Sequence, residues 1–300
     1  MRFARNPSRK NCLTKMPITN CKLTLFLIVV FATTWCSWVR GQTTVRFTDA
    51  EPIVQRNQGD SQKPYVLILP GILGQQVWDR NIKNGILKSE LNADVEIFDW
   101  TSGPLMAGFN FGGNPSKIKY LSERIREFKQ RNPSRPLYLI GHSGGCRMVV
   151  GILEQLPAGP IIEKALLLSP CLDAYYDLEP AIQSCSGELV SFRSPMDLTI
   201  SLPLTAVHGL AHGRLSMSAS VIGFKNASAS NPRFTEIDYE PSMISTGHTG
   251  GHFGWTHPAI VSLYIVPLLM PGESDSVFRP SSPNSGFGTL RYGNHRSFVR

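Results

Sequence analysis

From residue 64 to residue 270, short continuous apolar runs alternate along this chain with segments whose apolar residues are spaced as in a helix. Short apolar runs are typical of strands that are buried on both faces of a sheet. We assign such runs to Tyr65–Leu69, Val95–Trp100, Pro136–Ile140, Lys164–Pro170, Glu188–Phe192 and Arg233–Tyr239.

The segments between these runs have helical character. The clearest helix covers Lys117–Arg131, in which apolar residues recur at three- and four-residue spacing on one face. Further helices are predicted at Gln76–Leu91, Cys146–Leu156 and His257–Leu269. Strands that alternate with helices predict an α/β fold, with a mostly parallel central sheet flanked by helices.

The loops that follow the predicted strands should open on one edge of the sheet, where ligands bind in such folds. The connection after the fourth strand, Cys171–Gly187, is too short for a large cap domain. Any lid would therefore come from Thr101–Ser116 or Leu198–Pro232.

The first 41 residues follow the order of an export signal. A basic stretch precedes the apolar run Leu23–Trp35, and Val39 and Gly41 occupy the small-residue positions of a cleavage site before Gln42. The alternative is an uncleaved membrane anchor, although the run is shorter than the roughly 20 residues that span a bilayer. Met16 would begin a shorter and more ordinary signal.

The domain organisation follows from these changes of pattern. We expect a signal peptide or N-terminal anchor at residues 1–41, a polar lead-in at 42–63, a single α/β domain at 64–270 and a disordered tail at 271–300. The tail is rich in Pro, Ser and Gly. The protein is then exported, either secreted or periplasmic, and membrane-anchored if the leader is not cleaved.

The net charge of +8 is concentrated in the leader. Seven basic residues and no acidic residue lie there, which leaves 23 basic against 22 acidic residues in the remainder. A nearly neutral domain argues against nucleic acid as a partner. Membrane association is expected only through the N-terminal segment.

One serine lies between a predicted strand and a predicted helix, in the sequence Gly141-His142-Ser143-Gly144-Gly145. The spacing fits G-x-S-x-G, in which a sharp strand-to-helix turn exposes a nucleophilic hydroxyl. The outer glycines leave room for that turn. A structural glycine turn is the alternative, but the apolar strand before it and the apolar helix after it favour the catalytic interpretation.

Together with LILPGILG (Leu67–Gly74), this turn resembles the α/β-hydrolase superfamily, in particular its esterase and lipase-like members. The resemblance covers roughly Tyr65 to Met270. It implies the α/β-hydrolase fold and a catalytic triad in the chain order Ser, Asp, His.

The resemblance also implies an oxyanion hole of two backbone N–H groups. Gly144 supplies one, and Ile72 is the first candidate for the other, with Leu73 second. A plain strand-ending turn is the alternative for this loop. The family commonly has histidine where Pro70 stands, and this departure removes any role for that side chain without affecting the donor amide.

Asp197 is the candidate acid because it follows a predicted strand by five residues, where the family's acid usually lies. Such a carboxylate would orient the catalytic imidazole and stabilise its cation. Asp173 and Asp177, after the fourth strand, are the alternatives. Any of these carboxylates would otherwise cap a helix or a turn.

Three histidines, His248, His252 and His257, precede the final predicted helix, where the family's base lies. We favour His252 because the surrounding GGHF resembles the family's local pattern. His248 is the second choice, and His257 is the third because it directly precedes Pro258. His142, within the serine turn, is expected to pack or hydrogen-bond beside the site.

Neither a metal nor a cofactor is expected. His248 and His252 have the spacing of zinc ligands on a helix, but the glycines around them argue against a helix. Cys146 is expected to be a small buried residue, and Cys171 and Cys185 flank one connection and are candidates for a disulfide.

The sequence therefore predicts an exported serine hydrolase with the triad Ser143, His252 and Asp197, acting on a small-molecule or lipid ester. A peptidase, an amidase or a thioesterase would carry the same triad. A non-catalytic binding protein with the hydrolase fold is the alternative from another class. The sequence does not indicate an oligomeric state.

Overall fold

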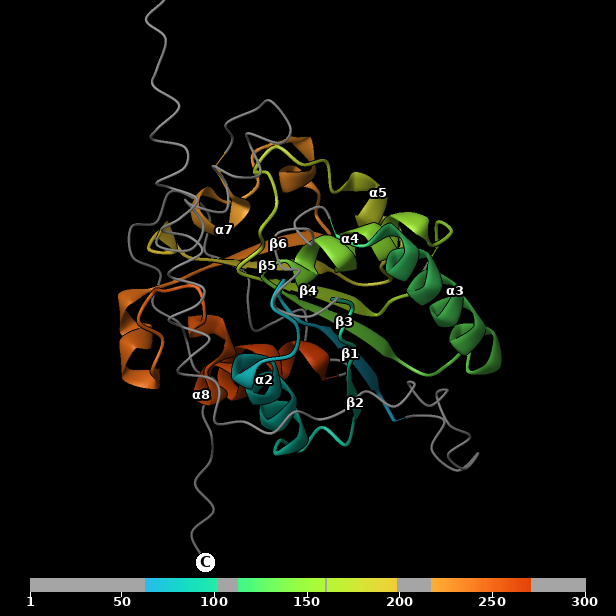
Figure 1. Ribbon diagram of the computed structural model, residues 1–300, viewed down its shortest axis with the longest axis horizontal. Coiled ribbons are helices and arrows are strands. Elements are labelled where there is room, and N and C mark those ends of the chain that lie inside the picture. Colours follow the sequence, from blue (N-terminus) through green and yellow to red (C-terminus); the bar gives the residue numbers. More distant parts are fainter. Residues whose placement is uncertain (1–62, 102–112, 160, 199–216, 271–300) are drawn as a thin grey trace, which may run out of the picture. The chain divides into compact units, whose positions relative to one another are not determined.

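The computed structural model describes residues 63–101, 113–159, 161–198 and 217–270 (Figure 1). The leader, nearly all of the lead-in, the tail and most of both predicted lid segments lie outside the described residues. None of the helices in the described ranges has the length and apolar character that a membrane span requires.

The described strands are β1 (Tyr65–Leu69), β2 (Asp94–Ile97), β3 (Leu137–His142), β4 (Lys164–Leu168), β5 (Leu189–Arg193) and β6 (Phe234–Asp238). The α-helices are α2 (Val77–Leu87), α3 (Pro115–Arg131), α4 (Gly145–Gln155), α5 (Glu179–Ile182), α7 (Ala219–Ile222) and α8 (Pro258–Ile260). The 3₁₀ helices are η2 (Ala227–Ser230), η3 (Pro241–Thr246), η4 (Gly254–Thr256) and η6 (Pro267–Leu269), and η5 (Val261–Ile265) is a π-helix.

In this part of the chain the six strands form one sheet in the order β2-β1-β3-β4-β5-β6. Every neighbouring pair is parallel. The central strands β1, β3 and β4 are buried along their whole length, which explains their continuous apolar sequences. The predicted α/β fold, with a mostly parallel sheet flanked by helices, is confirmed.

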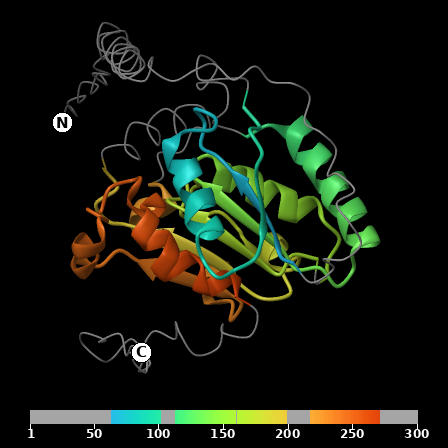
Figure 2. The same ribbon diagram turned by 90° about the horizontal axis from the view of Figure 1, so that it is seen from below.

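Helices cover both faces of the sheet, with α2 and α8 below it and α3, α4 and α5 above it in Figure 1. Alternate strand residues such as Val66 and Ile68 form one core with Ile82 and Ile86 of α2 and with the C-terminal helical segment. Figure 2 shows α2 beside that segment. Helix α2 and this segment can approach closely because Gly85 has no side chain. A Cβ at this position would lie only 2.5 Å from Cγ1 of Val261.

Several element boundaries differ from the sequence prediction for local reasons. Helix α3 begins at Pro115 rather than Lys117, because the Asn114 side chain accepts the Lys117 N–H at 3.2 Å and caps the helix. Strand β2 ends at Ile97, and the predicted final helix consists of three short segments that begin at Pro258.

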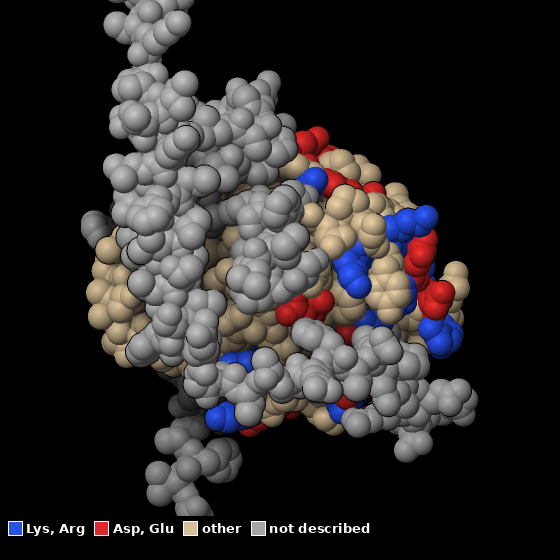
Figure 3. All heavy atoms as spheres, viewed as in Figure 1, with Lys and Arg blue, Asp and Glu red and all other residues tan. Residues whose placement is uncertain are grey.

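The exposed side of α3 carries both signs of charge, which Figure 3 shows as intermixed blue and red spheres. Lys119 and Glu123 form one i,i+4 pair, and Arg131 and Glu127 form another. Pairs of this kind are typical of a solvated helix face and contribute little to stability.

The site is positioned by the strand order. The chain leaves β1 for β2 on one side of it and then returns to β3 on the other side. Ligands of open α/β sheets bind at such a reversal, outside the carboxyl ends of the strands. The loop after β1 and the serine turn after β3 therefore lie next to each other at this position.

Candidate active site

Ser143 stands between the end of β3 at His142 and the start of α4 at Gly145. Its backbone φ is +55°, in the left-handed region that favours glycine. A serine held in this conformation between a buried strand and a helix has the geometry of a nucleophile elbow. The strain is maintained by the packing around the turn.

The glycines beside the serine allow backbone segments to approach closely. A Cβ on Gly145 would lie 2.0 Å from the carbonyl oxygen of Leu69, and one on Gly141 would lie 2.7 Å from Cα of Cys146. Neither backbone atom has room to move away, so the turn requires glycine at both positions.

The loop after β1 packs directly on the serine turn. A Cβ on Gly144 would lie 2.4 Å from Cγ2 of Ile72 and 3.3 Å from its backbone nitrogen. The loop is held from behind by Trp100, whose Nε1–H donates to the carbonyl oxygen of Pro70 at 2.7 Å. The structure thus brings the backbones of Ile72 and Gly144 together, whereas the side chain of Leu73 is exposed.

His252 and Asp197 form a buried pair. Nδ1 of His252 lies 2.7 Å from Oδ2 of Asp197, and Oδ1 of Asp197 and Nε2 of His252 have no hydrogen-bond partner among the described residues. Burial lowers the pKa of His252 below its usual 6.5, although the adjacent carboxylate opposes this shift. The imidazole is therefore neutral at neutral pH, with Nδ1–H on the carboxylate and a lone pair on Nε2.

Two serines hold the loop that carries His252. The hydroxyl of Ser169, at the end of β4, donates to the carbonyl oxygen of His252 at 2.8 Å. The hydroxyl of Ser194, after β5, donates to the carbonyl oxygen of Gly250 at 2.6 Å. Gly247 and Gly250 have positive φ, so these hydrogen bonds fix a loop that its own sequence leaves flexible. Neither serine was singled out from the sequence, because a serine after a strand carries no distinct signal.

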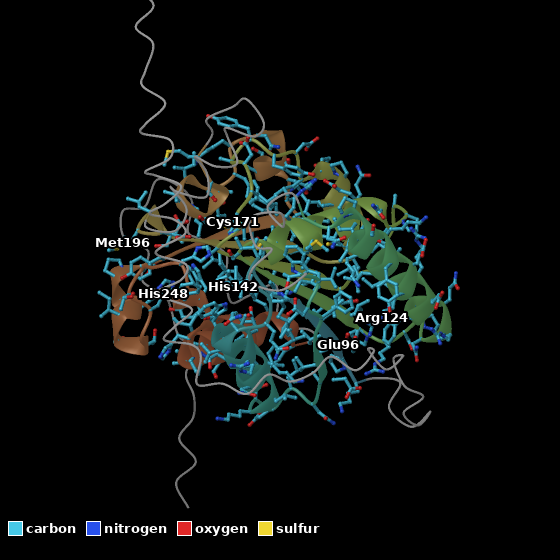
Figure 4. The ribbon with its side chains drawn as sticks, viewed as in Figure 1. Glu96, Arg124, His142, Cys171, Met196 and His248 are labelled. Carbon is cyan, nitrogen blue, oxygen red and sulfur yellow. The ribbon has the colours of Figure 1, made fainter. Side chains whose placement is uncertain are left out.

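Ser143 does not have His252 as its hydrogen-bond partner in this conformation. Its Oγ lies 3.4 Å from Sγ of Cys171, in the loop after β4, and Nε2 of His252 is unpartnered within the described ranges. The His252 ring lies beside that of His142, the residue before Ser143, with the two ring centroids 5.6 Å apart. Cys171 and His142 are labelled near the centre of Figure 4.

The other two histidines near the final helix have different environments. The His248 ring is buried between Tyr239 and Trp255, with centroid distances of 4.7 and 4.5 Å, and its Nδ1 accepts the Gly250 N–H at 2.9 Å. Burial lowers the pKa of His248 to about 4. His257 is exposed and immediately precedes α8.

The alternative carboxylates accept hydrogen bonds from their own loops. Asp173 accepts the N–H of Tyr175 at 2.8 Å. Asp177 accepts the N–H of Glu179 at 3.0 Å, at the start of α5. Both therefore stabilise turns, whereas Asp197 is the carboxylate that contacts the imidazole of His252.

A second buried histidine–carboxylate contact lies beside the first. Nδ1 of His142 is 3.3 Å from Oδ1 of Asp79, while Oδ2 of Asp79 accepts the Gln76 N–H at the start of α2. Asp79 therefore links the first turn of α2 to the serine turn. Sequence reasoning missed it because an acidic residue in the first turn of a helix is ordinary.

The three described cysteines are free. The suggested disulfide between Cys171 and Cys185 is wrong, because the two thiols lie at opposite ends of β4. Cys171 is beside Ser143 at the carboxyl end, and Cys185 pairs with Ile162 before the strand begins. Cys146 is buried as expected, and its thiol donates to the Gly141 carbonyl oxygen at 3.3 Å.

Comparison with protein-family models gives no match, and comparison with curated proteins gives none either. Among solved structures, a poly(3-hydroxybutyrate) depolymerase from Bordetella parapertussis is similar with a TM-score of 0.44 at 12% identity, over 69% of this chain and 82% of that one. The esterase domain of a Rhodothermus marinus protein is similar with a TM-score of 0.39 at 13% identity, over 68% and 84%. A cutinase-like protein from Cryptococcus sp. is similar with a TM-score of 0.38 at 15% identity, over 70% and 97%.

Proposed function

We propose that this chain is a serine hydrolase of the α/β-hydrolase type that cleaves carboxylic esters, because it combines a parallel sheet flanked by helices with a serine on a strained strand-to-helix turn. The observation that carries the proposal is the buried pair of His252 and Asp197 at the same sheet edge as Ser143. A strained serine alone would be compatible with a structural turn. The imidazole of His252, with its unpartnered Nε2 among the described residues, is the candidate for the base that a serine hydroxyl needs.

The proposed reaction uses an acyl-enzyme intermediate. Ser143 Oγ attacks the ester carbonyl while Nε2 of His252 takes its proton, and the resulting imidazolium then protonates the leaving alcohol. Asp197 keeps the Nδ1–H tautomer and stabilises the imidazolium. Water then attacks the acyl group with His252 again acting as the base. For the first step the Ser143 hydroxyl must turn its proton toward His252.

The backbone N–H groups of Gly144 and Ile72 are proposed to stabilise the oxyanion. The close approach of these two residues supports this assignment, because both donors must reach one oxygen. Gly144 also immediately precedes α4, where the helix dipole favours negative charge.

Apolar side chains around this edge favour an ester with an apolar acyl group. The exposed large residues in the segments that follow β1, β4 and β5 include Leu73, Tyr175, Met196, Leu198 and Val77, the first residue of α2. Because the strands are parallel, these loops open on the same side as Ser143. An apolar rim of this kind stabilises a bound acyl chain by removing its surface from water.

A fluorophosphonate probe tests the reaction class, because it phosphonylates an activated serine without requiring the natural substrate. The folded protein should be labelled at Ser143, and Ser143→Ala and His252→Ala should not be labelled. A folded wild-type protein that resists labelling would mean a non-catalytic binding protein. Nitrophenyl esters of short and long acids, matched with an anilide and a thioester, would then separate esterase from amidase and thioesterase activity.

Export is proposed from the pattern of residues 1–41. Expression of the full-length chain in a secreting host should give a protein whose first residue is Gln42. Recovery of the uncut chain in the membrane fraction would instead identify the segment as an anchor.

A further inference from the structure

The loop after β4 brings a thiol to the candidate nucleophile. Sγ of Cys171 lies 3.4 Å from Oγ of Ser143, and the Cys171 backbone N–H points to the carbonyl oxygen of Ser143 at 3.4 Å. The same loop begins at Ser169, the other non-glycine residue with positive φ among the described residues, at +48°. Ser169 also holds the His252 loop through its hydroxyl.

The polar neighbour of the Cys171 thiol is the hydroxyl of the proposed nucleophile, Ser143. The buried Nε2 of His252 is unpartnered among the described residues, so in the resting conformation Ser143 Oγ has Cys171 at hydrogen-bonding distance instead of the base. The oxygen can use a lone pair for the thiol and still keep its own proton for His252. The reverse arrangement, with the hydroxyl donating to sulfur, would withhold that proton from the base.

The thiol stays protonated at the pH at which the base works. Burial raises the pKa of Cys171 to about 12; the hydrogen bond with Ser143 opposes this shift, and the negative charge of Asp197 adds to it. Cys171 is therefore a neutral S–H donor at neutral pH rather than a thiolate that competes with the serine. Oxygen is both a better acceptor and a better donor than sulfur, so the pair can form in either direction. The S–H···O direction is the one that leaves the Ser143 proton available to His252.

We propose that Cys171 is a positioning residue for Ser143, whose S–H donates to Oγ, fixes its rotamer and stabilises the negative charge that develops on it during attack. The inference rests on the proposed function of Ser143 as the nucleophile. This donor from the loop after β4 acts on the attacking oxygen Oγ and is separate from the two donors proposed for the oxyanion of the substrate. The charge on Oγ is transient, so this contact is strengthened chiefly in the transition state, and its loss reduces kcat with little change in KM.

The test compares Cys171→Ala, which removes the donor, with Cys171→Ser, which keeps a hydroxyl donor on the same stem. Cys185→Ala is the matched control, because that thiol is buried near the opposite end of β4, away from Ser143. The rate of phosphonylation of Ser143, kcat and KM for nitrophenyl butyrate, and the melting temperature are measured for each full-length variant.

Cys171→Ala should slow phosphonylation and lower kcat about fivefold, the factor expected for one ordinary hydrogen bond, at an unchanged KM. Cys171→Ser should recover most of the rate, and Cys185→Ala should match the wild type. Equal or faster labelling of Cys171→Ala, or failure of Cys171→Ser to recover at an unchanged melting temperature, would overturn the positioning role. If the wild type itself is not labelled, it is the proposed function that fails.

Discussion

Nδ1 of His252 and Oδ2 of Asp197 are 2.7 Å apart, and the side chains are only 2% and 0% exposed. Burial of a carboxylate is costly unless hydrogen-bond donors compensate it. The imidazole N–H supplies one, and in return the carboxylate stabilises the imidazolium that forms when Nε2 accepts a proton. The hydrogen bond between the two side chains thus compensates for the burial of both.

Asp197→Asn should lower kcat about 10⁴-fold, because an amide of the same shape favours the wrong imidazole tautomer and cannot stabilise the cation. KM should change little, since Asp197 is behind His252 and is not placed against the substrate. Steady-state kinetics on a nitrophenyl ester measure the effect. A loss of less than tenfold with a normal melting temperature would exclude Asp197 as the acid.

The acid limb of kcat/KM should have its midpoint below pH 6.5, because burial lowers the pKa of His252. The base is active when neutral, so activity is full above this pKa and is lost as the pH falls through it. Asp197 opposes the shift. Asp197→Asn should therefore move the acid limb of the residual activity to still lower pH, and a shift toward higher pH would contradict the pairing.

The sequence was most informative where one pattern had one structural solution. The apolar runs that became β1, β3 and β4 could be assigned because strands buried on both faces need continuous apolar sequence. The turn at Ser143 could be located because its glycine spacing is a pattern of adjacent residues, although Gly145 is required by the backbone of Leu69 and only Gly141 by the turn itself. Both signals are local, so a single sequence carries them.

Contacts between distant segments were not accessible in this way. Cys171 and Ser143 are 28 positions apart, and nothing near Cys171 marks it as a neighbour of the serine rather than a partner for Cys185. The choice between His248 and His252 also depended on contacts with distant segments. Both lie in one glycine-rich loop, and they differ in which ring meets Asp197 and which is enclosed by Trp255.

His248→Asn should reduce the pH dependence of stability. The pKa of His248 is about 4 in the folded protein against its usual 6.5, so the unfolded state binds more protons between these values. The contribution to stability is therefore complete above pH 6.5 and is lost as the pH falls toward 4. Asparagine keeps an acceptor for the Gly250 N–H but does not titrate.

Thermal unfolding of the wild type and of His248→Asn across this pH range measures the difference. The wild type should lose more of its melting temperature on acidification than the variant. Parallel curves would show that His248 is not buried in its neutral form. The variant should also keep measurable phosphonylation of Ser143, which His252→Ala should lose.

Ser194→Ala should lower kcat by loosening the histidine loop. Removal of the hydroxyl leaves the buried carbonyl oxygen of Gly250 without this donor, at a cost of about 1–3 kcal/mol. Because Ser194 holds the backbone and is not placed against substrate, the loss should appear with KM nearly unchanged. Ser262→Ala, which alters an exposed serine of the final helical segment, is the control and should behave as the wild type.

Gly145→Ala should abolish activity and destabilise the fold by about 3 kcal/mol, as expected when a methyl group is forced into a packed interior. Its Cβ would lie 2.0 Å from the carbonyl oxygen of Leu69 and 2.6 Å from that of Pro70. Relief would require β1 to separate from the serine turn, which would also displace Ile72 from Gly144.

Gly251→Ala is the matched control, because it changes a glycine adjacent to His252 whose added Cβ has no atom within 4 Å. Neither Gly145 nor Gly251 has positive φ, so backbone strain does not distinguish them. Chemical denaturation and phosphonylation rates should therefore separate the two variants through close approach alone. Equal stability of the two variants would mean that the serine turn is not packed against β1 as described.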